Sequence, residues 1–150
     1  METKLLVAID LSENSLKAVD YVGNMLSCHG TVQITLLTVI KEPSPDTMPD
    51  EEQRKSQVEA WRSKTLALME RAAERLKATG VSEKHIRLKI QICTRPVSVA
   101  ELILREQQNE GYGTIVVGRR GVTKREEFLF GSVSSTIVRE ARHCTVWVVE

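Results

Sequence analysis

The sequence lacks three features that would each point to a definite class of protein. Net charge is almost absent, because 21 Lys and Arg residues balance 20 Asp and Glu residues to leave +1 at neutral pH. This balance gives no electrostatic surface for nucleic acid or an anionic membrane. The three cysteines, Cys28, Cys93 and Cys144, are odd in number and have no CxxC or zinc-finger spacing. We therefore expect reduced, partly buried thiols, with no disulfide framework and no zinc site.

The third missing feature is a long hydrophobic run. The longest apolar stretches, residues 5–9 and 34–40, are far shorter than the roughly 20 residues that span a bilayer. Residues 1–4 lead into a short apolar run that lacks the pattern of a secretory signal. These observations predict a cytoplasmic protein with no membrane partner.

What remains is the composition of an ordinary globular protein. Hydrophobic residues make up 41% and charged residues 27% of the chain, which excludes disorder and collagen. A chain of 150 residues is long enough to bury most of its apolar surface in one compact domain. We expect a single domain that covers residues 1–150.

Strands and helices are predicted to alternate along the chain. The hydrophobic periodicity predicts strands at 4–9, 32–40, 86–93, 112–118 and 145–149, and helices at 13–28, about 51–79, 98–107 and 131–142. Ser12, Asp50 and Ser98 are the expected N-caps, the last two with capping-box spacing to Gln53 and Glu101. This alternation favours an α/β fold, in which helices cover both faces of one open, parallel, five-stranded sheet.

The hydrophobicity of the strands predicts their order in the sheet. The first strand is fully apolar and belongs inside, whereas residues 86–93 alternate apolar and polar side chains and belong at an edge with one wet face. This indicates the order 3-2-1-4-5, with a topological switch point between strands one and four. Ligands of such sheets bind at the carboxyl ends of the strands at that point, where Asp10 and Gly118 would lie.

A glycine-rich segment begins at the same place. It reads Val117-Gly118-Arg119-Arg120-Gly121, then nine residues, then Gly131-Ser132-Val133-Ser134. Glycines let the backbone approach a phosphate, and the free amides at a helix N-terminus favour an anion. The alternative is that Gly118 and Gly121 are turn residues and that Ser132 is an N-cap.

This spacing, G-x2-G-x9-G-S, together with a first strand that reads Val7-Ala8-Ile9-Asp10, resembles the universal stress protein family. The resemblance covers nearly the whole chain. It implies a flavodoxin-like sheet, frequent homodimers and, in the branch with this glycine pattern, ATP bound at the switch point. The chain departs from the family pattern at Thr94, where a glycine is common, and at Thr145, where a proline is common.

The resemblance also implies which residues form the site. Matched position by position, the residues that wrap the phosphates and ribose are Gly118, Arg119, Gly121, Gly131, Ser132, Val133 and Ser134, and Val117 leads into them. Those near the adenine and ribose are Ala8, Asp10 and Val39. Asp10 would accept a hydrogen bond or help to hold a Mg²⁺ ion on the phosphates; its alternative role is as an N-terminal partner of the first helix.

The last strand, Thr145 to Val149, is apolar, contains Trp147 and falls at the other edge of the sheet. An uncovered apolar edge promotes aggregation, so we expect it to pair with the same strand of a second copy. The alternative is that loop residues of the same chain cover it.

The functional hypothesis is an ATP-binding regulatory module of the stress response, with no catalytic residue, no protein metal site and at most slow hydrolysis. No water-activating residue stands in the glycine motif. One alternative is a dimeric interaction protein of the same fold that binds no nucleotide. Another is an enzyme that turns over an adenylated or phosphorylated metabolite.

Overall fold

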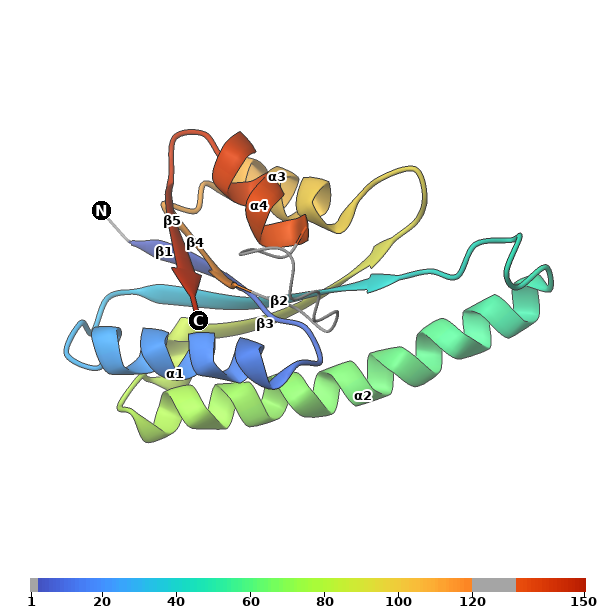
Figure 1. Ribbon diagram of the computed structural model, residues 1–150. Helices are drawn as coiled ribbons and strands as arrows, with labels where there is room; N and C mark the ends of the chain where they lie inside the picture. The colour runs from blue at the N-terminus through green and yellow to red at the C-terminus, as the bar shows by residue number, and fades with distance from the viewer. Residues whose placement is uncertain (1–2, 120–131) are drawn as a thin grey trace.

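The computed structural model describes residues 3–119 and 132–150. They form one five-stranded parallel sheet in the order β3-β2-β1-β4-β5, with helices on both faces (Figure 1). The strands are β1 (Lys4–Ala8), β2 (Gln33–Lys41), β3 (Ile86–Cys93), β4 (Thr114–Gly118) and β5 (Thr145–Val149). The helices are α1 (Glu13–Leu26), α2 (Glu51–Ala78), η1 (Glu83–His85), α3 (Val99–Glu110) and α4 (Ser132–Glu140). The predicted α/β class, element order and strand order are confirmed.

The helix boundaries differ from the prediction where a local conformation ends the helix. Helix α3 continues past the predicted end at Gln107 to Glu110, because Gly111 adopts a left-handed conformation with φ of 69° and ends it there. Strand β4 therefore begins at Thr114 rather than at 112.

The N-caps also differ in detail. Ser98 and Glu101 form the predicted capping box. Asp50 caps α2 by accepting a hydrogen bond from the main-chain N–H of Glu52, and not through a box with Gln53. Ser12 is the N-cap residue of α1, but its hydroxyl makes no capping bond and donates to Asp10 instead.

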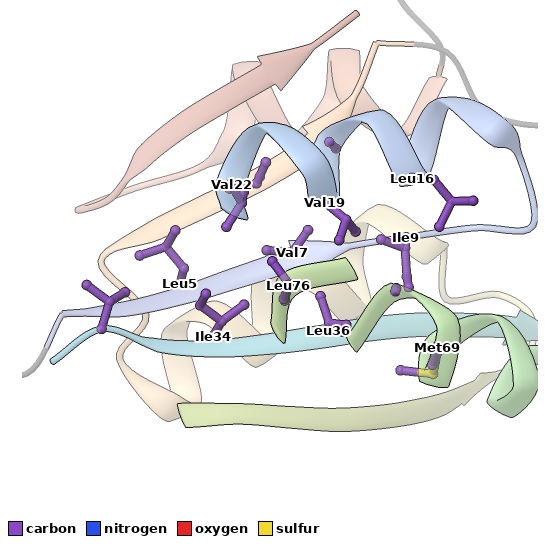
Figure 2. Packing of buried hydrophobic residues seen from close by; sticks show 14 residues of the cluster. Leu5, Val7, Ile9, Leu16, Val19, Val22, Ile34, Leu36, Met69 and Leu76 are labelled. Carbon is purple, nitrogen blue, oxygen red and sulfur yellow. The ribbon is translucent and has the colours of Figure 1, made fainter. Parts of the chain in front are cut away.

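The hydrophobic core has two layers because side chains alternate between the faces of each strand. Leu5, Val7 and Ile9 of the first strand segment point to α1 and α2, where they pack with Leu16, Val19, Val22, Ile34, Leu36, Met69 and Leu76 (Figure 2). Leu6 points the other way, into a second cluster with Leu37, Ile103, Ile115, Val117 and Ile137. Each fully buried aliphatic side chain contributes about 1.5–3 kcal/mol to folding, so both layers are needed for stability.

The exposed face predicted for the edge strand β3 is wrong in part. On its polar side, the buried carboxylate of Glu106 of α3 accepts hydrogen bonds from Lys89 Nζ at 2.7 Å and from Gln91 Nε2 at 2.8 Å, whereas Arg87 is exposed. Its apolar side leaves Leu88 and Ile92 more than one-third exposed. The alternation predicted that the polar side chains of this strand would contact water, but Lys89 and Gln91 contact the Glu106 carboxylate of α3 instead.

The cysteines carry no disulfide, as predicted, but their burial differs. Cys93 is buried and Cys144 half-buried, whereas Cys28 is exposed and not a packing residue. Burial raises the pKa of the Cys144 thiol. Among the described residues, no helix combines the length and apolar character that a membrane span requires.

Candidate functional site

The ends of β1 and β4 lie side by side at the switch point. Ala8 is in register with Val117 of β4 on one side and with Leu37 of β2 on the other. The chain leaves β1 through Ile9, whose N–H donates to the carbonyl of Leu37 at 2.9 Å. Strand β4 ends at Gly118, so the loops that carry Asp10 and Arg119 start from adjacent strand ends.

An apolar wall runs along the α3 and α4 face of these strand ends. Ala8 of β1, Val39 of β2 and Val133 of α4 are all partly buried and pack against the cluster of that face. Three residues predicted from three separate segments therefore pack against the same core cluster. Partly buried apolar side chains next to polar strand ends are suited to contact with a nucleobase.

The Arg119 main chain, just after β4, makes hydrogen bonds to both β5 and α4. The Arg119 N–H donates to the carbonyl of Val149 at 2.7 Å, which extends the pairing of β4 with β5. The Arg119 carbonyl accepts a hydrogen bond from Ser134 Oγ at 3.0 Å. The first bond ties the end of β4 to β5, and the second holds the first turn of α4 against the end of β4.

Ser134 itself is 2% exposed, and its hydroxyl has one proton, which this bond directs to a protein carbonyl. In this arrangement the Ser134 hydroxyl positions the helix, and contact of Ser134 with a ligand stays a prediction. Ser132, at the start of α4, is exposed.

The first turn of α4 offers a concentration of donors. Ser132, Val133 and Ser134 are its first three residues, and N–H groups at such positions have no acceptor within the helix. The helix dipole adds partial positive charge at this end. A role of these residues in phosphate binding stays a prediction.

Asp10 is held in a ring of hydrogen bonds at the start of α1. Its Oδ1 accepts from the Ser12 N–H at 2.8 Å, from the Ser12 hydroxyl and from Ser15 Oγ at 2.5 Å. The Asp10 N–H in turn donates to Ser15 Oγ at 2.8 Å. The alternative role, a partner of the first helix, is therefore the one the geometry displays, while contact of Asp10 with a ligand stays a prediction. Buried Ser15 was missed from the sequence because nothing in its spacing marks it.

The Arg119 side chain forms an ion pair with Glu150. The distance from Nη1 to Oε1 is 2.5 Å, and the side chains are 21% and 78% exposed. Glu150 was not predicted as part of the site. The register that places Gly118 beside Val149 makes Arg119 and Glu150 neighbours, so a predicted β4–β5 pairing is the signal that could have found it.

Two predicted site residues, Gly121 and Gly131, lie outside the described residues, as do Arg120 and the segment 122–130. Within residues 3–119 and 132–150, no cluster of three or more His, Cys, Asp or Glu side chains is arranged to hold a metal ion.

The comparison with protein families identifies the chain. The sequence model of the Universal stress protein family matches residues 1–150, and the chain therefore belongs to this family. A comparison with curated protein sequences found no match.

Solved structures of the family have the same fold. Universal stress protein UspA from Lactobacillus plantarum has a TM-score of 0.85 at 19% identity, covering 99% of this chain and 98% of that one. A universal stress protein in complex with cAMP has a TM-score of 0.67 at 20% identity, with 99% and 96% coverage. The universal stress protein from Archaeoglobus fulgidus in complex with dAMP has a TM-score of 0.59 at 14% identity, with 100% coverage of both chains. Structural relatives of this chain thus include nucleotide complexes.

Proposed function

We propose that this chain binds a nucleotide at the carboxyl ends of β1 and β4, that the nucleotide is ATP, and that its binding regulates interactions with a partner. The observation that carries the proposal is the β4–α4 junction, where Ser134 and Arg119 hold a helix N-terminus against the end of a strand at the switch point. The cAMP and dAMP complexes of structural relatives support nucleotide binding by this fold.

The phosphates would accept hydrogen bonds from the first N–H groups of α4, beginning with Ser132 and Val133. Gly118 leaves the end of β4 without a side chain, and the predicted contacts of Gly121 and Gly131 complete the phosphate site. The adenine would lie against Ala8 and Val39.

A Mg²⁺ ion carried by the phosphates would find a carboxylate ligand in Asp10. The hydrogen bonds described above all go to its Oδ1, so Oδ2 is the oxygen we assign to the ion. No water-activating residue stands in the glycine motif. The proposal therefore includes at most slow hydrolysis.

The first residue of α4 provides a direct test. Proline is tolerated at the first position of a helix, so Ser132→Pro removes one N–H and one hydroxyl with little cost to α4, whereas Ser132→Ala removes the hydroxyl alone. We expect Ser132→Ala to weaken ATP binding by about two- to tenfold and Ser132→Pro by about ten- to 100-fold, since a hydrogen bond to a charged group contributes about 1.5–3 kcal/mol. Isothermal titration calorimetry measures both.

Glu51→Pro is the matched control, because Glu51 is the exposed first residue of α2. It should leave ATP affinity unchanged. Equal affinities for Ser132→Pro and the unmodified chain would place the phosphates elsewhere. No ATP binding by the unmodified chain, with no nucleotide released on denaturation and detected by mass spectrometry, would favour the interaction protein that binds no nucleotide.

We also propose a homodimer through β5. This strand lies at the edge of the sheet, and apolar side chains flank it on both faces: Tyr21 of α1 meets Trp147 edge-on at 6.0 Å between ring centroids, and Val138 of α4 is 54% exposed. An apolar edge with apolar flanks is suited to an isologous contact with a second copy.

Backbone direction allows this contact to be tested without disturbing the sheet. Thr145 and Val149 hydrogen-bond toward β4, so strand alternation directs the N–H of Val148 to the open edge. Val148→Pro should therefore give monomers in sedimentation with an unchanged circular dichroism spectrum. Leu88→Pro, on the opposite edge strand β3, is the control and should stay dimeric. A dimeric Val148→Pro variant would move the contact elsewhere.

A cytoplasmic location belongs to the proposal as well. It rests on the sequence patterns described above, and fractionation of cells that express the chain tests it.

A further inference from the structure

The ion pair between Arg119 and Glu150 places an anion of the protein beside the proposed phosphate site. Resting on the proposed function, we infer that Glu150 competes with the phosphates of the nucleotide for the Arg119 guanidinium and so lowers the affinity of the site. Glu150 then helps to set the affinity for phosphorylated ligands, because the Arg119–Glu150 ion pair must be replaced by an Arg119–phosphate contact when the ligand binds.

Hydrogen bonds fix the main chain of Arg119, so the exchange of Glu150 for a phosphate would involve its side chain. Its N–H is bonded to Val149 and its carbonyl to Ser134. The guanidinium is carried on a flexible stem, and its carboxylate partner is 78% exposed. Rotation of the Arg119 side chain away from Glu150 therefore leaves the main-chain hydrogen bonds to β5 and α4 in place.

Both charged groups belong to the face that α4 covers. Val117 and Val148 pack into the cluster beneath α3 and α4. Side chains alternate along a strand, so Arg119 and Glu150, two residues further along each, are directed to the same face. The first turn of α4 is bonded to Arg119 on this face. The Arg119 guanidinium is thus on the side where the phosphates would bind.

The energies favour phosphate over Glu150. An ion pair whose carboxylate is largely exposed is weak, because water screens it and both side chains lose freedom. A phosphate next to a helix N-terminus is already held by main-chain donors, and its contact with arginine is bidentate. Phosphate therefore displaces the Glu150 carboxylate. Loss of the Arg119–Glu150 ion pair lowers the observed affinity by about two- to fivefold, which corresponds to the usual free energy of a largely exposed ion pair.

The test uses calorimetric titration with two probes, ATP and adenosine, which lacks phosphate. Glu150→Gln should bind ATP about two- to fivefold more tightly than the unmodified chain and adenosine with unchanged affinity. The gain should disappear in an Arg119→Gln background and shrink at high salt, because screening already weakens the pair.

Glu140→Gln is the matched control, because it removes the same charge from an exposed arginine pair at the other end of α4, with Arg139 at 3.2 Å. An equal gain for Glu140→Gln, or a gain for Glu150→Gln that survives in the Arg119→Gln background, would reduce the effect to net charge and overturn the inference. Unchanged ATP affinity for Glu150→Gln would overturn it while leaving nucleotide binding intact. Absence of ATP binding by every variant and by the unmodified chain would instead remove the proposed function.

Discussion

Replacement of Ser134 by alanine tests the bond that holds α4 against β4. The bond from Ser134 Oγ to the Arg119 carbonyl is 3.0 Å long and almost completely buried, so its loss leaves a carbonyl without this donor. Loss of such a bond costs about 1–1.5 kcal/mol. Alanine also has a higher helix propensity than serine by up to about 0.5 kcal/mol, which offsets part of the loss. We expect a net decrease in the free energy of unfolding of about 0.5–1 kcal/mol.

Ser135→Ala separates the two terms. Ser135 is the next residue of α4 and is exposed, so its replacement adds helix propensity without removing a buried bond. Urea unfolding followed by circular dichroism should place the Ser134→Ala midpoint below that of Ser135→Ala by about 0.5 M, from a difference of about 1–1.5 kcal/mol and a slope of about 2–3 kcal/mol per molar urea. We also expect weaker ATP binding by Ser134→Ala alone. Coincident unfolding curves would show that Ser134 does not hold this junction.

Two further predictions concern the scaffold of the site. A Cβ at Gly23 would come within 2.7 Å of Thr79 Oγ1, so Gly23→Ala should lower the free energy of unfolding by about 1–2 kcal/mol. Adding Thr79→Ala to the Gly23→Ala variant should restore most of this loss. Gly30→Ala is the control, because its Cβ meets no atom within 4 Å and should not destabilise the fold by a clash. Glu106→Ala should cost about 1.5–3 kcal/mol. The hydrogen bond to Glu106 raises the pKa of half-exposed Lys89, so the stabilisation from this pair is present below pH 10.5 and is lost as the pH rises through the folded pKa. Urea unfolding of the unmodified chain and of Glu106→Ala, at pH 8 and at higher pH, should show that the difference in their free energies of unfolding shrinks as the pH rises. A difference that stays constant would contradict a stabilising role for the Lys89–Glu106 pair.

The fold could be predicted because its determinants are local or periodic. The fully apolar first strand identified the sheet interior, the alternation in residues 86–93 identified an edge, and capping residues such as Ser98 marked helix starts. Errors arose where a single residue decided the outcome. Gly111 ended α3 in a left-handed conformation, which moved the start of β4 by two residues.

The site could be predicted less completely. Residues at strand ends, such as Asp10 and Gly118, follow from the strand order. The partners of these residues do not, because they depend on side-chain contacts formed after the chain has folded. Ser15 reaches Asp10 across a turn, and Glu150 reaches Arg119 through the register of β4 and β5. The same reason explains why the hydrogen bond from Lys89 to the buried carboxylate of Glu106 was missed.

The most direct test of the account is a titration of the isotope-labelled chain with ATP, followed by the amide resonances in two-dimensional nitrogen–proton NMR spectra. Nucleotide binding at the switch point should give saturable shifts of the amides of Gly118, Arg119, Ser132 and Val133, which flank the β4–α4 junction, while amides of α2 near Glu51 stay in place. An unchanged spectrum at millimolar ATP, or shifts confined to residues away from this junction, would contradict it.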